Sequence, residues 1–272
     1  MAKESKGHIF YYSDPLNDDF EKTKTLKRIE LPKDYKYIHT NIFYRIYAFL
    51  LFWCIAKPVL KTILFFGGVR VKGKKYIKEV KKNGTGGFIY MNHTSFWDMI
   101  DIQAAVVPWR RSNIIGYTDT LTLPRFVRFL AIGLGFIPLP SSVSDYRKFD
   151  ECLKYYYEKH KRFTIIFPEA HIWPYYTKIR PYISTSFKYP SKLNAPVIPI
   201  TTCFSKRRFS SKPKVTLYVS KAIYPKKELS VNENKEYLRN ECYKAMCEMA
   251  EKYSTYSYYE YKKVDKDEAS KN

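Results

Sequence analysis

The sequence predicts an α/β fold, in which a mixed, largely parallel sheet is flanked by helices and preceded by an apolar helical hairpin. From Asn83 onward, short apolar runs rich in β-forming residues alternate with longer polar or amphipathic stretches. Such alternation is typical of strands that are joined by helices around one sheet. A chain of 272 residues with 45% hydrophobic residues is also long enough to bury a large core.

The position of each element follows from these runs. Strands are expected at 87–91, 113–117, 133–139, 162–167, 195–204 and 214–220, and helices near 95–106, 124–131, 145–160 and 234–253. The chain then divides into a polar N-terminal segment that covers the body or stays mobile, an apolar hairpin, the α/β domain and a flexible tail without periodicity, at 1–40, 41–69, 70–253 and 254–272.

Two prolines mark the start of the expected strand 195–204. Pro196 and Pro199 have no backbone N–H to donate to a neighbouring strand. They would be unusual in a central strand that is paired on both sides.

The segment 42–68 is the most apolar part of the chain. Its uninterrupted stretch before Lys57 and Pro58 is about 15 residues, or roughly 22 Å of helix, against a hydrocarbon core of about 30 Å. Pro58 is expected to kink or break the helix. Aromatic residues within the segment and basic residues at both ends favour a helix lying in the membrane interface. A pair of core helices and a true membrane span remain alternatives.

Composition excludes several classes of protein. The formal net charge is +22, which favours contact with polyanions such as nucleic acid or an anionic membrane, although compositional bias explains part of it. The five cysteines are scattered without a CxxC pair, so neither a disulfide framework nor a thiolate zinc site is indicated. The N-terminus has no apolar run behind a basic start, so a reducing, cytosolic setting is expected for the α/β domain.

The sequence NHTSFWD directly follows the expected strand 87–91, where α/β sheets bind ligands. On one continuous helix, His93 and Asp98 would lie roughly 140° apart, so they can meet only if His93 precedes the helix. Thr94 and Ser95 are candidate N-caps that would leave His93 outside it. Asp98 could then fix one imidazole nitrogen and leave the other as a base. The alternative is a structural capping box formed by Ser95 and Asp98.

No protein nucleophile accompanies this pair. The chain has no GxSxG motif and no cysteine beside His93, so direct attack by a substrate hydroxyl is the simplest chemistry. No metal is expected, because no HExxH motif occurs and the histidines form no recognisable ligand set; they are His8, His39, His93, His160 and His171.

A second constellation, FPEAHIW, follows the expected strand 162–167. Glu169 stands at a strand end without an obvious role in a core, and Lys178 and Arg180 beyond it could hold an anion. The alternative is a solvated loop that carries ordinary charges.

Four ordered blocks, over about residues 65–225, resemble the glycerolipid acyltransferase family, most of all 1-acyl-sn-glycerol-3-phosphate acyltransferases. They are the HX4D pair, GFIPL at 135–139, FPEA at 167–170 and APVIPI at 195–200. The resemblance implies that His93 is the general base, that Asp98 orients it and that Glu169 contributes to acceptor binding. It also implies an acyl-CoA or acyl carrier protein co-substrate, no further cofactor, and a membrane-associated enzyme on the cytoplasmic face.

The chain departs from the family pattern where the acceptor phosphate would bind. The third block commonly reads FPEGTRS, and here Ala170, His171 and Ile172 replace Gly, Thr and Arg. Ser141 follows the second block, where a basic residue is common.

Other cations must therefore bind an anionic headgroup. We expect Arg180 first, because a guanidinium can hold two phosphate oxygens, then Lys178, with Arg147 and Lys148 in reserve.

The resemblance predicts acyl transfer to lysophosphatidic acid, giving phosphatidic acid, with an anionic membrane and no nucleic acid as partner. The alternatives are a sibling enzyme acting on glycerol 3-phosphate, another lysophospholipid or an aminolipid, and a basic binding protein for membrane or nucleic acid that keeps only the scaffold.

Overall fold

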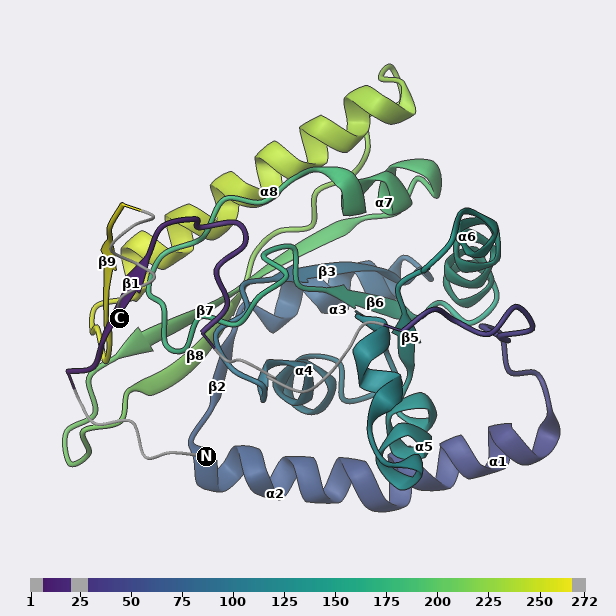
Figure 1. The fold of residues 1–272 in the computed structure, drawn as a ribbon, viewed down its shortest axis with the longest axis horizontal. Coiled ribbons are helices and arrows are strands. Elements are labelled where there is room, and N and C mark those ends of the chain that lie inside the picture. The colour runs from purple at the N-terminus through teal and green to yellow at the C-terminus, as the bar shows by residue number, and fades with distance from the viewer. Residues whose placement is uncertain (1–6, 21–28, 266–272) are drawn as a thin grey trace.

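A seven-stranded sheet forms the centre of the molecule in the computed structural model, which describes residues 7–20 and 29–265 (Figure 1). Its strand order is β2-β8-β7-β3-β6-β4-β5, and all neighbours are parallel except β7 and β8. The strands are β2 Arg70–Lys72, β3 Gly87–Met91, β4 Asn113–Gly116, β5 Phe136–Pro138, β6 Phe163–Ile166, β7 Val197–Ser205 and β8 Lys214–Val219.

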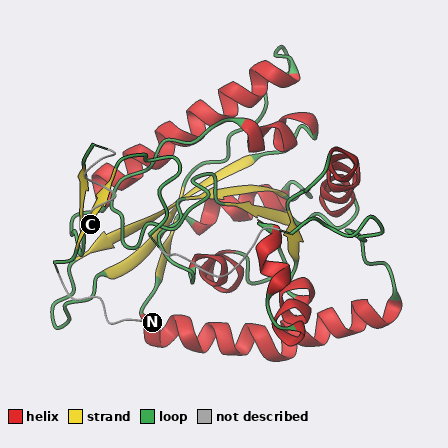
Figure 2. Ribbon diagram, viewed as in Figure 1, coloured by secondary structure: helices red, strands yellow, loops and turns green. Residues whose placement is uncertain are grey.

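Helices cover both faces of this sheet (Figure 2). They are α1 Ile42–Leu50, α2 Lys57–Gly67, α3 Lys74–Lys82, α4 Asp98–Asp101, α5 Arg125–Gly133, α6 Val143–Glu158, α7 Lys188–Lys192 and α8 Val231–Tyr253. Shorter turns are the π-helical segments Leu51–Ala56 and Ile102–Val106 and the 3₁₀ turns Thr118–Thr122 and Thr185–Phe187. The predicted fold class is confirmed, although β2 and α3 had no counterpart among the expected elements.

The central strand β3 shows why the sheet is buried on both sides. Phe88 and Tyr90 pack into the core beneath α6, α7 and α8, whereas Ile89 and Met91 pack into a second core with α3. All five residues of β3 are buried, as expected for a parallel strand covered by helices on both faces.

Strand β7 is interior, although it contains Pro199. It pairs with β3 on one side and with β8 on the other, so proline does not mark an unpaired strand here. The ladder to β8 begins only at Ile200, and the carbonyl of Pro199 accepts a hydrogen bond from Ser220 N at 2.9 Å. The missing N–H therefore falls at the end of a ladder, where it disrupts little.

The apolar segment is one continuous helix, Ile42–Gly67, and not a hairpin. The prediction that Pro58 divides it was wrong because a π-helical segment lies directly before α2. There Lys57 N donates to Phe52 O, five residues back, and this change of hydrogen-bond register accommodates the proline without ending the helix.

This helix lies along one side of the body, at the bottom of Figure 1. Tyr47 donates to Phe129 O at 2.8 Å and stacks on the Phe129 ring, which joins α1 to α5. Gly133 permits this close approach, because a Cβ there would lie 2.5 Å from the Tyr47 hydroxyl. The buried face of the helix consists of Ala48, Leu51, Phe52, Ala56 and Leu64.

The two ends of the chain meet in a small parallel sheet of β1, Ile9–Tyr12, and β9, Glu260–Lys263. Tyr258 and Tyr259 are buried there against Phe10. The described part of the segment 254–272 is therefore packed, contrary to the expected flexible tail, because its aromatic side chains find partners in the N-terminal segment. Residues 1–6, 21–28 and 266–272 lie outside the described residues, so the expectations for those ranges are not tested.

Candidate active site

The loop that carries His93 begins at the end of β3 and is fixed at its first residue. The side chain of Asn92 exchanges two hydrogen bonds with the backbone of Thr202 in β7: Thr202 N donates at 2.8 Å, and the amide donates to Thr202 O at 3.2 Å. Asn92 is 1% exposed. The neighbouring strand therefore sets the direction in which the chain leaves the sheet.

Asp98 organises the rest of this loop. One carboxylate oxygen, Oδ2, accepts from Thr94 N at 2.6 Å and from Ser95 N at 2.8 Å, and lies 3.1 Å from His93 Nδ1. Helix α4 begins at Asp98, and its N-cap, Trp97, makes no side-chain cap bond. Ser95 nonetheless caps the turn that leads into the helix, because its hydroxyl accepts from Trp97 N at 3.2 Å and its carbonyl accepts from Asp98 N at 3.1 Å. The N–H of Thr94 belongs to the loop that wraps around the carboxylate.

This geometry joins the two interpretations of Asp98 that the sequence left open. The carboxylate stabilises the turn and also holds the imidazole, so its structural and orienting roles coincide. A carboxylate at Nδ1 favours the tautomer that leaves Nε2 unprotonated. The His93 side chain is 12% exposed, and its ring stacks on Phe167 at 4.2 Å. His93 is thus held on one side and partly open on another, as a general base requires.

Glu169 ties the His93 loop to the loop that follows β6. Its carboxylate accepts from His93 N at 3.1 Å and from Arg180 N at 2.9 Å, and Trp173 N donates to His93 O at 3.1 Å. Glu169 is 4% exposed. Glu169 therefore joins the two loops, and the contribution to acceptor binding that the resemblance implied stays a prediction.

Arg180 is buried beside Glu169, contrary to the expectation that it is free to hold a phosphate. It is 1% exposed, and its Nη2 lies 3.4 Å from Glu169 Oε2 while donating to the carbonyls of Glu169 and His171. Its guanidinium also covers the Trp173 ring at 4.8 Å. Burial raises the pKa of Glu169, and the nearby Arg180 charge opposes that rise.

The other predicted phosphate ligands are engaged elsewhere or exposed. Lys178 is exposed, Arg147 faces Glu151 at 3.7 Å, and Lys148 donates to Lys33 O at 2.7 Å. Within residues 7–20 and 29–265, none of these cations forms a hydrogen bond or ion pair with His93 or Asp98.

Sequence reasoning missed the aromatic surroundings of the dyad. Phe96 and Trp97 are 51% and 45% exposed beside Asp98, and Phe167 stacks on His93. The available signal was that each of these aromatic residues lies next to a motif residue in the sequence. In the described part of the chain, no group of three or more His, Cys, Asp or Glu side chains could hold a metal ion.

The candidate active site lies in a region that matches a known protein family. A family model described as Acyltransferase matches residues 68–202, which contain His93, Asp98 and Glu169. Among curated proteins no match was found.

A solved structure with a similar fold is PlsC, the 1-acyl-sn-glycerophosphate (LPA) acyltransferase of Thermotoga maritima. The TM-score is 0.50 at 20% sequence identity, and the match covers 76% of this chain and 88% of that chain. The resemblance carried by the four blocks is thereby confirmed, and the α/β domain of this chain, over residues 68–202, belongs to the acyltransferase family.

Proposed function

We propose that the protein transfers an acyl group from acyl-CoA or acyl carrier protein to the free hydroxyl of lysophosphatidic acid, giving phosphatidic acid. The observation that carries this proposal is the 3.1 Å contact between His93 Nδ1 and Asp98, which leaves the imidazole partly exposed in an acyltransferase-family domain.

The reaction needs one base and no protein nucleophile. Nε2 of His93 removes the proton from the acceptor hydroxyl, whose oxygen forms a bond to the thioester carbonyl carbon. The C–S bond then breaks, and the leaving thiolate takes the proton back from the imidazolium. Asp98 stabilises the positive charge that His93 carries between the two transfers.

The developing oxyanion needs donors that are still free. The N–H groups of Thr94 and Ser95 donate to Asp98, and that of His93 donates to Glu169. Since these groups are engaged, other donors must stabilise the tetrahedral intermediate.

The apolar helix suits an enzyme that works at a membrane surface. At 26 residues it is about 39 Å long, which exceeds the hydrocarbon thickness, so length alone permits a span. Its contacts with the body favour a helix that lies in the interface instead. Its exposed face continues onto α5, and the exposed apolar side chains are Ile42, Phe43, Ile46, Phe49, Leu50, Ile55, Val59, Ile63, Phe65, Phe66, Phe126, Val127 and Phe129.

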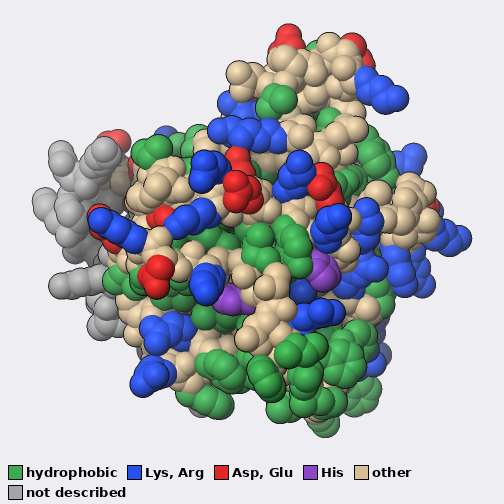
Figure 3. Space-filling view, turned by 90° about the vertical axis from the view of Figure 1, so that its right-hand side faces the viewer, with side chains coloured by type: hydrophobic (Ala, Val, Ile, Leu, Met, Phe, Trp, Pro, Cys, Tyr) green, Lys and Arg blue, Asp and Glu red, His purple; other side chains and the backbone are tan. Residues whose placement is uncertain are grey.

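Figure 3 shows hydrophobic side chains gathered along the lower edge of the molecule, with Lys and Arg side chains above them. An apolar band beside basic residues is the arrangement by which a protein lies on an anionic bilayer. We propose attachment on the cytoplasmic face, where such lipids are common.

Among the phosphate ligands expected from the sequence, Lys178 remains the candidate of choice, because it is exposed close to Glu169 in the chain. The altered third block, with Ile172 in place of an arginine, also supports a second candidate function: acylation of an acceptor other than a phosphomonoester.

Thioester consumption tests both candidates. Purified protein in a mild detergent is given acyl-CoA or acyl carrier protein thioester with lysophosphatidic acid, glycerol 3-phosphate, lysophosphatidylcholine or an aminolipid, and release of free thiol is measured. The proposal expects release that depends on lysophosphatidic acid and is abolished in His93→Ala. Release only with another acceptor would select the second candidate, and no acceptor-dependent release with any of them would refute both.

A further inference from the structure

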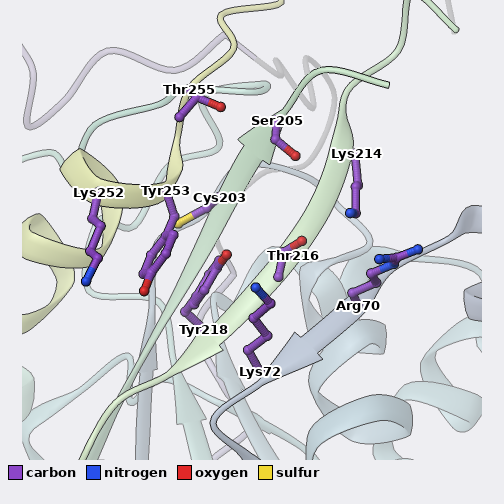
Figure 4. Close-up of a pocket in the computed structure, with 10 residues that line it drawn as sticks. All are labelled: Arg70, Lys72, Cys203, Ser205, Lys214, Thr216, Tyr218, Lys252, Tyr253 and Thr255. Carbon is purple, nitrogen blue, oxygen red and sulfur yellow. The ribbon is translucent and has the colours of Figure 1, made fainter. Parts of the chain in front are cut away.

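A cavity at the β2 edge of the sheet is lined by four cationic side chains (Figure 4). Its volume is about 290 Å³, and it lies between β2, β8, the end of β7 and the C-terminal end of α8. Its cationic side chains are Arg70, Lys72, Lys214 and Lys252, and the remaining lining residues include no carboxylate. None of these lining residues forms a hydrogen bond or ion pair with His93 or Asp98.

Two stacked tyrosines hold two of these cations in place. The rings of Tyr218 and Tyr253 are 4.0 Å apart and nearly parallel, with an interplanar angle of 9°. Lys72 Nζ lies 5.4 Å from the Tyr218 ring, and Lys252 Nζ lies 5.4 Å from the Tyr253 ring. Figure 4 shows the order Lys252, Tyr253, Tyr218, Lys72 across the cavity. Cation–π contact restrains an ammonium group without neutralising its charge.

The positive charge of the cavity is uncompensated. In the described part of the chain, none of the four cations forms an ion pair. The cations are drawn from three elements, β2, β8 and α8, and their mutual repulsion opposes bringing them together. Hydroxyl groups of Ser205, Thr216 and Thr255 also line the cavity and can donate hydrogen bonds. This set of donors and charges is suited to a phosphate group.

The cavity lies next to the end of the apolar helix. Arg70 follows the last helical residue, Gly67, by three positions, and Arg207 Nη2 donates to Gly67 O at 2.6 Å. Arg207 belongs to the hairpin 206–213 that joins two strands lining the cavity, β7 and β8.

The same hairpin presents an apolar tip. Phe209 is 89% exposed, and at the end of α2 Phe65 and Phe66 are 80% and 78% exposed. Exposed aromatic side chains surrounded by basic residues are typical of segments at the membrane interface. The phosphate source closest to this cavity is therefore the lipid surface itself.

We propose that this cavity binds the phosphate headgroup of an anionic phospholipid and so fixes the protein on the membrane at a second point, separate from the His93 site. The apolar helix supplies insertion that does not depend on lipid charge, whereas the cavity supplies recognition of the headgroup. The inference does not depend on which acceptor the His93 site acylates.

Flotation with vesicles tests the site in the full-length protein. Vesicles contain phosphatidylcholine alone or with 20% phosphatidic acid, and the triple variant Lys72→Gln, Lys214→Gln, Lys252→Gln is compared with wild type. We expect the variant to lose at least tenfold in apparent affinity for the phosphatidic acid vesicles and to change less than twofold for phosphatidylcholine vesicles. Circular dichroism reports whether the variant is folded.

A matched triple removes the same charge elsewhere. Lys188 in α7, Lys227 before α8 and Lys244 in α8 are exposed. Figure 1 shows α7 and α8 on the opposite side of the molecule from α2. Changing these three lysines to Gln should alter the affinity for phosphatidic acid vesicles less than threefold. Equal losses in both triples would overturn the site and indicate diffuse attraction.

A soluble ligand is the other source of phosphate. If the cavity triple kept its affinity for phosphatidic acid vesicles but raised the apparent KM for acyl-CoA in detergent, the cavity would serve the thioester donor and the lipid assignment would be wrong. If the lipid assignment is right, turnover on detergent-dispersed substrates stays within twofold of wild type, so failure of the site is distinguishable from failure of the proposed acyl transfer.

Discussion

Two buried carboxylates that follow neighbouring strands have partners of different chemistry and exposure. Asp98, after β3, and Glu169, after β6, are 2% and 4% exposed, and each accepts two backbone N–H groups. The partner of Asp98 is His93, whose side chain is 12% exposed, whereas the partner of Glu169 is Arg180, which is 1% exposed. In the proposed mechanism, similar charge pairs therefore serve chemistry in one loop and architecture in the other.

Access to substrate makes the difference. A histidine that can gain and lose a proton at an open nitrogen can move protons to and from substrate. An arginine keeps its charge, and here its guanidinium donates hydrogen bonds to the Glu169 carboxylate and to nearby carbonyls. Charge type at a strand end is thus a weaker guide to function than the exposure of the partner.

Removal of the imidazole should have the largest effect on the first pair. We expect His93→Ala to lower kcat by about 10² to 10⁴-fold, because loss of a general base costs this much. Thiol release measures turnover, and thermal unfolding should shift little. His171→Ala is the matched control, since His171 lies in the Glu169 loop, 3.5 Å from Asp19, and its loss should change kcat by less than threefold. More than half of wild-type activity in His93→Ala would contradict the assigned base.

Asp98→Asn separates the two roles of that carboxylate. The amide oxygen can still accept from the loop N–H groups, but its lost charge no longer stabilises the imidazolium. We expect kcat to fall on the order of 10²-fold with a folded protein. Wild-type kcat would show that Asp98 only supports the turn.

Removal of the arginine from the second pair should lower the stability of the protein. Arg180→Ala leaves Glu169 buried without its charge partner, which costs about 3 to 5 kcal/mol in the free energy of unfolding. Urea unfolding in detergent measures this, and exposed Lys178→Ala is the control. A well-folded Arg180→Ala protein with a raised KM for lysophosphatidic acid alone would restore the phosphate role predicted from the sequence.

A third buried carboxylate, that of Asp101, extends the comparison because this side chain forms no hydrogen bond or ion pair with other described residues. Burial, and next the charge of Asp98, raise the pKa of Asp101 to about 7. The native state thus holds a proton that the unfolded state releases near pH 4, so stability falls as pH rises from about 4 to 7.

Asp101→Asn should remove this pH dependence. Between pH 5 and pH 8 the stability of the variant should rise relative to wild type by about 2 to 3 kcal/mol. Urea unfolding at both pH values checks it, and a constant difference would show that Asp101 titrates normally.

The smallest effect concerns the backbone of the Glu169 loop. Ala170 has φ of 65°, a left-handed conformation that costs an L-residue about 1 to 2 kcal/mol. Ala170→Gly should therefore stabilise the protein by up to about 1 kcal/mol, after the added flexibility of the unfolded chain is subtracted. Ala245→Gly, inside α8, should instead destabilise it by about 1 kcal/mol. A loss of stability in Ala170→Gly would show that the loop tolerates the methyl group without strain.

Local patterns explain most of the correct predictions. The strand at 87–91 was predicted from its apolar run, and the meeting of His93 and Asp98 from the placement of His93 in the turn before the helix, because both features involve residues close together in the chain. The short β2 and the helix α3 escaped notice, since three strand residues and a helix rich in lysine carry little hydrophobic signal.

The sequence by itself determined the α/β architecture, the acyltransferase motifs and the placement of His93 before the helix, because periodicity and spacing act within one or two elements. Only the tertiary structure decided that Arg180 is buried on Glu169, that the tail packs on the N-terminal segment, and that Arg70 and Lys252 share one cavity. These outcomes depend on which distant surfaces exclude water together, and the burial of a charge is decided by its final neighbours and not by the residues beside it in the chain.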